Sequence, residues 1–170
     1  MINRLKQLAI CSILVLAACG QNDPTTQPTD SKTEETVVKT EDKVENAIVF
    51  INAYVENSNK MSEAVGMVEW VQASDLATTS FKEEFKRIVD EAFKQDPEIG
   101  LDADPLLDAQ DYPSLGFKFD SFDEKTNYLL VKGIDSPEFK LTMKLVEENG
   151  NWIVDGCGII NVPKDKRSER

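Results

Sequence analysis

The apolar residues change from a helical spacing to a strand spacing halfway along this chain, which limits the fold to helices followed by strands. Apolar residues first recur at the i, i+3, i+4 and i+7 spacing of one helix face: Val44, Ala47, Ile48, Ile51, Tyr54 and Val55. Later they alternate with polar residues, as in a half-buried strand: Phe139, Leu141, Met143 and Leu145. The sequence therefore predicts an α+β fold, with about three N-terminal helices packed on a four-stranded antiparallel sheet.

Two more helices are expected between these patterns. A short helix over 63–71 has three residues that we expect inside: Val65, Val68 and Trp70. A longer helix begins at the capping-box sequence of residues 80–83 and ends before Pro97.

The dipeptide Asn149-Gly150 predicts a tight hairpin, because a type I′ turn needs a positive φ at both central residues. With these two residues as the turn, the register pairs Leu145 with Val154, Met143 with Gly156, and Lys144 with Asp155. The apolar pairs then share one face, and the Lys144–Asp155 pair lies on the other.

The first twenty residues have the pattern of a secretory signal. Arg4 and Lys6 precede an apolar run over 8–18, which is too short to span a bilayer, and Leu16-Ala17-Ala18-Cys19 follows the pattern of bacterial lipoproteins. The alternative is an ordinary signal in which Cys19 is incidental. The chain is therefore divided into a signal peptide (1–18), a lipidated Cys19 with a disordered tether (19–40), one domain (41–163) and a polar tail (164–170).

This pattern also predicts a location. Gly20 follows the cysteine, where an aspartate would signal retention at the inner membrane. We expect a lipid-anchored protein of the bacterial cell envelope, held at the outer membrane through its acyl chains and facing the periplasm.

Composition excludes several kinds of chemistry. The net charge is −12, which disfavours binding to nucleic acid, and the chain has no histidine, which excludes Ser-His-Asp and histidine–zinc sites. Cys157 is expected to be buried and inert, since Cys11 leaves with the signal and Cys19 carries lipid. No catalytic residue, metal site or cofactor is predicted.

Two sets of residues are candidates for binding. Four large apolar groups are candidates to line a pocket between the helices and the sheet, and the alternative is that they are simply core residues: Tyr54, Trp70, Tyr128 and Met143. An acidic, proline-containing loop over 96–113 is the candidate surface site, with five residues singled out: Asp104, Pro105, Asp108, Asp111 and Tyr112. Within it, Asp104 is expected to cap a one-turn helix that begins at Pro105.

Two short motifs carry a resemblance to a known family. They are Asp104-Pro105-Leu106 through Asp111-Tyr112-Pro113, and Trp152 through Gly158 with the sequence WIVDGCG. With the lipoprotein signal, they resemble the envelope lipoproteins of the domain-of-unknown-function 3828 family, over about residues 41–163. The resemblance implies a cystatin-like, nuclear-transport-factor-2-like cone fold, and it implies no catalytic residues.

These observations favour a non-catalytic binding or accessory lipoprotein of the envelope. Its acidic surface suits a basic protein partner, and one variant is a periplasmic immunity protein directed against a basic toxin. The alternative is a small-molecule binding protein or enzyme of the cone fold, which would use Asp155 or Asp111 with Tyr54 or Tyr128.

Overall fold

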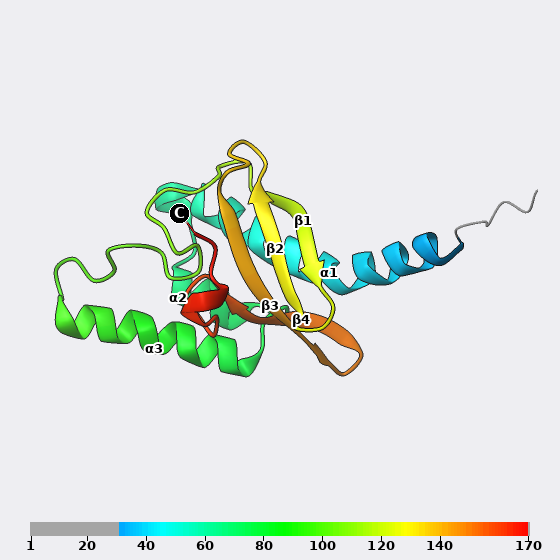
Figure 1. The fold of residues 1–170 in the computed structure, drawn as a ribbon. Coiled ribbons are helices and arrows are strands. Elements are labelled where there is room, and N and C mark those ends of the chain that lie inside the picture. The colour runs from blue at the N-terminus through cyan, green and yellow to red at the C-terminus, as the bar shows by residue number, and fades with distance from the viewer. Residues whose placement is uncertain (1–30, 170) are drawn as a thin grey trace, which may run out of the picture. The chain divides into compact units, whose positions relative to one another are not determined.

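The structure is a computed structural model that describes residues 31–169, with side chains from residue 40 onward. It has three α-helices, α1 (Ser31–Ser58), α2 (Met67–Ala73) and α3 (Thr79–Gln95), and two 3₁₀ turns, η1 (Met61–Glu63) and η2 (Lys164–Lys166). Four strands follow α3: β1 (Phe117–Asp123), β2 (Tyr128–Gly133), β3 (Lys140–Glu148) and β4 (Asn151–Cys157). The predicted α+β order of helices and then strands is confirmed (Figure 1). The predicted signal peptide and Cys19 lie outside the described residues.

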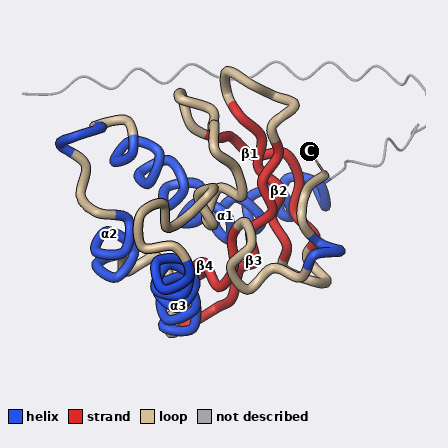
Figure 2. The backbone as a smooth tube through the Cα atoms, turned by 90° about the vertical axis from the view of Figure 1, so that its left-hand side faces the viewer, coloured by secondary structure: helices blue, strands red, loops and turns tan. Residues whose placement is uncertain are grey.

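The four strands form one open antiparallel sheet in the order β1-β2-β3-β4. Helix α1 crosses one face of this sheet and contacts β1, β3 and β4, while α2 and α3 pack against each other (Figures 1 and 2). The core lies between α1 and the sheet, and its largest fully buried side chains include Phe50, Tyr54, Phe81, Phe85 and Phe117. The interior is therefore filled by aromatic and aliphatic side chains.

Helix α1 starts earlier than predicted. It begins at Ser31, so residues 31–40 are helical, although the sequence analysis placed them in a disordered tether. The predicted start at Glu41 lies just before Val44, the first buried residue among those with described side chains, and helical periodicity is recognised from such buried residues. Residues 31–40 contain neither glycine nor proline, so nothing in their sequence ends the helix there.

Helix α2 begins at Met67, after the start predicted for the short helix at residue 63. Val65, which was expected inside, is exposed and lies in an extended connection. The side chain of Asn57 holds this connection, because its amide accepts from the Val65 N–H and donates to the Val65 carbonyl, at 3.0 and 2.8 Å. The prediction failed because Val65 precedes Gly66, the residue at which the helix is capped.

Helix α3 ends before Pro97, as predicted, but its N-cap differs. The cap is Thr78, whose Oγ1 accepts a hydrogen bond from the Phe81 N–H at 3.0 Å, and Ser80 lies inside the first turn. The Thr78 hydroxyl also donates to Asp155 Oδ1 at 3.0 Å, which ties the start of α3 to β4. The backbone of Thr78 adds a second link, because its N–H donates to the Val154 carbonyl.

Replacing Thr78 with alanine is expected to lower the free energy of unfolding by about 1–2 kcal/mol, the usual cost of losing an N-cap. Urea unfolding followed by far-UV circular dichroism measures this change. Ser80→Ala is the control, because Ser80 is the cap that the sequence suggests, and we expect it to cost less than about 0.5 kcal/mol. A larger loss for Ser80→Ala than for Thr78→Ala would contradict the assigned cap.

The β3–β4 hairpin has the predicted turn but an altered register. Asn149 and Gly150 both have positive φ, and Leu145 pairs with Val154 as predicted. Beyond this pair the register shifts, so the predicted partners of Met143 and Lys144 are wrong: Met143 pairs with Cys157, and Lys144 with Gly156. Asp155 is the extra residue of a β-bulge, which period-2 pairing from the turn does not anticipate.

A second bulge lies in β1. The register against β2 shifts between Phe119 and Ser121, which leaves Asp120 as the extra residue. Phe119 pairs with Val131 and Phe122 with Leu129, so the bulge keeps both phenylalanines on the inner face of the sheet. Asp120 lies on the outer face, where its carboxylate pairs with Lys132 and Lys140 at 2.8 and 2.9 Å.

Candidate functional site

The four candidate pocket residues are divided between the core and the outer face of the sheet. Tyr54 and Met143 are fully buried in the core. Trp70 packs against Phe50 and Tyr54, with ring centroids 5.5 and 5.2 Å apart. Tyr128 neighbours the inward-facing Leu129 along β2 and therefore points to the opposite face of the sheet. Tyr54, Trp70 and Met143 are therefore part of the core or packed against it, as in the alternative interpretation, and Tyr128 lies outside it.

Tyr54 and Asp104, which were predicted as parts of separate sites, are hydrogen-bonded to each other. The Tyr54 hydroxyl donates to Asp104 Oδ2 at 2.6 Å. The other carboxylate oxygen, Oδ1, accepts from the backbone N–H groups of Leu106 and Leu107 at 2.8 and 3.2 Å. This pair was not predicted from the sequence, since only Asp155 and Asp111 were considered as acidic partners for Tyr54.

Burial dominates the protonation of both groups. It raises the pKa of Asp104 above the usual aspartate range, and the hydrogen bonds from Tyr54, Leu107 and Leu106 oppose part of this shift. Burial also raises the pKa of Tyr54 far above the usual tyrosine range, and the nearby charge of Asp104 adds to that effect. A hydroxyl that is held so firmly in its protonated form is a hydrogen-bond donor and is unsuited to act as a base.

The candidate binding loop is anchored by its middle and exposed at its end. Asp104 caps a turn as predicted, but the turn is not a helix, and Pro105, Leu106 and Leu107 are buried. Asp108 is half-buried. The surface role predicted for Asp104 and Pro105 is therefore corrected, because these residues fasten the loop to the core.

The two motifs that carried the family resemblance are in contact. The Ile159 N–H donates to the Pro105 carbonyl at 3.0 Å, and Cys157 Sγ lies 3.4 Å from the Leu106 carbonyl oxygen. The thiol of Cys157 is buried, as predicted. The end of β4 and the loop therefore form one structural unit.

The exposed end of the loop borders a depression of about 490 Å³. Of the predicted surface residues, Asp111 and Tyr112 line it. Pro113 of the same loop also lines it, together with Ser136, Glu138 and Phe139 of the β2–β3 connection and Glu169 of the C-terminal segment. This depression is the part of the predicted surface site that remains open to solvent.

Asp155 has a structural role. Its carboxylate pairs with Lys144 Nζ at 2.9 Å and accepts from the Thr78 hydroxyl at 3.0 Å. The hydrogen bond that Lys144 donates to Asp155 raises the pKa of Lys144. Lys144 and Asp155 thus meet as predicted, although the bulge changes their backbone register.

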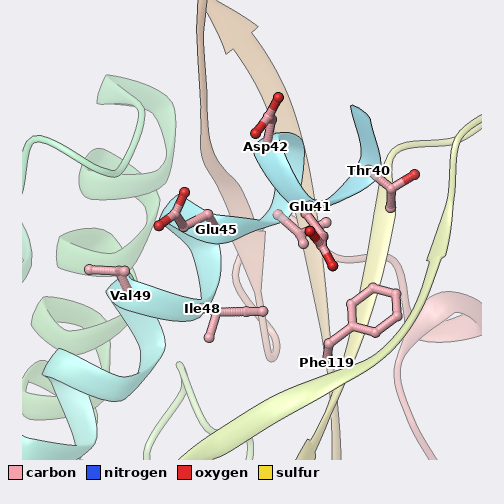
Figure 3. Close-up of a pocket in the computed structure, with 8 residues that line it drawn as sticks. Thr40, Glu41, Asp42, Glu45, Ile48, Val49 and Phe119 are labelled. Carbon is pink, nitrogen blue, oxygen red and sulfur yellow. The ribbon is translucent and has the colours of Figure 1, made fainter. Parts of the chain in front are cut away.

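A groove of about 610 Å³ lies between α1 and β1. Figure 3 shows Phe119 of β1 across from Ile48 and Glu41 of α1. The groove is lined by four apolar residues, Val44, Ile48, Val49 and Phe119, and by four polar residues, Thr40, Glu41, Asp42 and Glu45. We call this feature the α1–β1 groove.

The α1–β1 groove was not predicted from the sequence, although two signals were present. Val49 is an apolar residue off the buried stripe of α1, and Glu41, Asp42 and Glu45 form an acidic run on the same helix. Neither signal shows that Phe119, seventy positions further along the chain, lies beside them.

The described residues contain no helix that is long and apolar enough to cross a membrane, and no group of three acidic or cysteine side chains placed to hold a metal ion. Comparison with protein-family models, curated proteins and solved structures finds no match for this chain.

Proposed function

We propose that this chain is a membrane-tethered, non-catalytic binding protein of the bacterial cell envelope. The observation that carries the proposal is the sequence Leu16-Ala17-Ala18-Cys19 behind a charged and then apolar N-terminal segment. Lipid on Cys19 would hold the domain at the membrane, since two or more acyl chains anchor stably where one does not. The tether would raise the concentration of the domain near envelope partners.

The packing of the domain supports a binding role over an enzymatic one. Its core is filled, and the buried Tyr54 hydroxyl donates to a carboxylate within the protein. Its surface carries the α1–β1 groove, which combines apolar and acidic side chains. A net charge of −12 favours a basic protein partner, for which an accessory complex or a toxin–immunity pair are the two settings considered.

Replacing Cys19 with alanine is expected to move the chain out of the membrane fraction of a bacterial host, as a soluble or uncleaved species, because the acyl acceptor is lost. The measurement is fractionation of the full chain together with metabolic labelling by a radioactive fatty acid. Wild-type chain should carry label, and the variant should carry none.

Cys11→Ala is the matched control, since it removes a cysteine that lies within the predicted signal peptide. It should leave labelling and fractionation as in the wild type. Membrane fractionation of a processed Cys19→Ala chain, or equal loss of label in both variants, would remove the basis of the proposed function.

A further inference from the structure

The α1–β1 groove exposes more apolar surface than the fold requires. Phe119 pairs across the sheet with Val131, which is 0% exposed, yet Phe119 itself stays 43% exposed. Val49 of α1 is 50% exposed and lines the same groove. Single exposed apolar residues are ordinary, but apolar side chains from two elements that meet in one groove indicate a contact surface.

The groove is framed on both sides by the fold. Strand β1 is an edge strand of the sheet, and α1 passes beside it. The Thr40 hydroxyl donates to Glu124 Oε1 at 3.1 Å, which links the start of the groove on α1 to the β1–β2 turn. Its volume, about 610 Å³, falls within the usual range for binding pockets.

The rim of the groove carries negative charge that nothing in the described part of the chain neutralises. Glu41, Asp42 and Glu45 are exposed and form no ion pair with the described residues. Lys43 lies among them in sequence, but its Nζ is 5.1 Å from the ring centroid of Trp152. The rim therefore carries three exposed carboxylates that have no ion-pair partner among the described residues.

On helix α3, most acidic residues form ion pairs with basic residues of the same helix. Three of its four carboxylates pair with a basic residue one turn away: Glu84 and Glu91 with Arg87, and Asp90 with Lys86. On α1, by contrast, the residue four positions after Glu41 is Glu45, a spacing at which like charges destabilise a helix. A cationic ligand would relieve that repulsion.

We propose that the α1–β1 groove binds a cationic amphipathic helix of a membrane-associated partner protein. Apolar side chains of that helix would contact Ile48, Val49 and Phe119, and its lysines or arginines would face the acidic rim. The inference rests on the proposed function, which puts Cys19 at the membrane and leaves residues 20–30 between the lipid and the start of α1. A bare lipid surface is a poor occupant, because anionic headgroups repel the rim.

The test uses the full chain, purified from bacterial membranes and held in phosphatidylcholine nanodiscs, with empty nanodiscs as the blank. The probe is a fluorescein-labelled 18-residue helix of leucine and lysine, and the reference peptide has glutamate in place of lysine. Fluorescence anisotropy should show binding of the lysine peptide only. Two groove variants should each weaken binding of the lysine peptide about tenfold: Phe119→Ser, and the triple variant Glu41→Gln/Asp42→Asn/Glu45→Gln. In the triple variant, the affinity for the lysine peptide should also depend less on salt concentration.

The controls change the same residue types away from the groove. Phe93→Ser removes an aromatic residue that is 50% exposed on α3, and Glu56→Gln/Glu83→Gln/Glu98→Gln removes three exposed carboxylates. Both should leave binding within twofold of the wild type. Val49→Ser replaces Phe119→Ser if circular dichroism shows that the latter does not fold.

Three results would overturn the proposal: equal binding of the two peptides, equal losses in groove and control variants, or no loss in either groove variant. If sedimentation shows a dimer that Phe119→Ser dissociates, the groove holds a second copy and the proposal is wrong. If the lysine peptide does not bind but membrane fractionation still depends on Cys19, only the proposal for the groove is wrong. If the processed Cys19→Ala chain stays in the membrane fraction, the proposed function is wrong.

Discussion

Replacing Gly158 with alanine is expected to destabilise the domain by about 3 kcal/mol. Gly158 has a φ of +60°, where a residue with a side chain is strained by about 1–2 kcal/mol. A Cβ there would also overlap the Leu106 carbonyl oxygen and would lie 2.5 Å from the Pro105 carbonyl oxygen. Both are backbone atoms, so the loop itself has to move, and forced movement in a packed region costs a further 1–3 kcal/mol or so.

Gly150 provides a matched control for backbone strain alone. Its φ is +80°, but a Cβ at this position would have no neighbour within 4 Å. Gly150→Ala should therefore cost only about 1 kcal/mol. Urea unfolding of the wild type and the two variants measures both losses in the free energy of unfolding. The difference between the two losses is the cost of the close approach between the loop and the end of β4. Equal losses at the two positions would contradict that close approach.

The regular elements were largely predictable because their signals are local. The apolar stripe of α1, the end of α3 before Pro97 and the Asn149-Gly150 turn each depend on residues within a few positions of one another. The errors occurred where a distant contact decides the structure. Thr78 caps α3 in place of Ser80, and its hydroxyl and backbone also bind β4, a strand more than seventy residues away.

The candidate site was predictable only in part for the same reason. Asp104 was identified as a cap, but its contact with Tyr54 joins positions fifty residues apart. The α1–β1 groove joins α1 to Phe119, which no helical or strand spacing brings together. The bulge at Asp120 sets which face Phe122 occupies, and a single extra residue in a strand has no strong sequence signal.

Replacing Tyr54 with phenylalanine is expected to lower the free energy of unfolding by about 2 kcal/mol at pH 7. The change removes the hydroxyl that donates to Asp104 Oδ2 and leaves that oxygen without its donor inside the protein. Hydrogen bonds to charged groups contribute about 1.5–3 kcal/mol, and bonds between neutral groups about 1 kcal/mol. The loss should therefore shrink at pH 4, where more of Asp104 is protonated.

The direction of the pH dependence follows from the raised pKa of Asp104. Burial makes the folded chain hold this proton more tightly than the unfolded chain, whose aspartate has the ordinary pKa of 3.8. The resulting stabilisation is fully present below pH 3.8 and is lost as pH rises through the raised pKa. Asp104→Asn does not titrate, so its stability relative to the wild type should improve between pH 4 and pH 7.

Carboxylates with lowered pKa values, such as Asp120 beside Lys132 and Lys140, have the opposite pH dependence, but they are the same in every variant and cancel in the comparison.

Tyr128→Phe is the control, because within the described part of the chain its hydroxyl has no hydrogen-bond partner, and it should cost less than about 0.5 kcal/mol. Urea unfolding at pH 4 and pH 7 measures all three variants. If the loss for Tyr54→Phe matches that for Tyr128→Phe at both pH values, the Tyr54–Asp104 hydrogen bond does not fasten the loop, and the anchoring role of Asp104 is wrong.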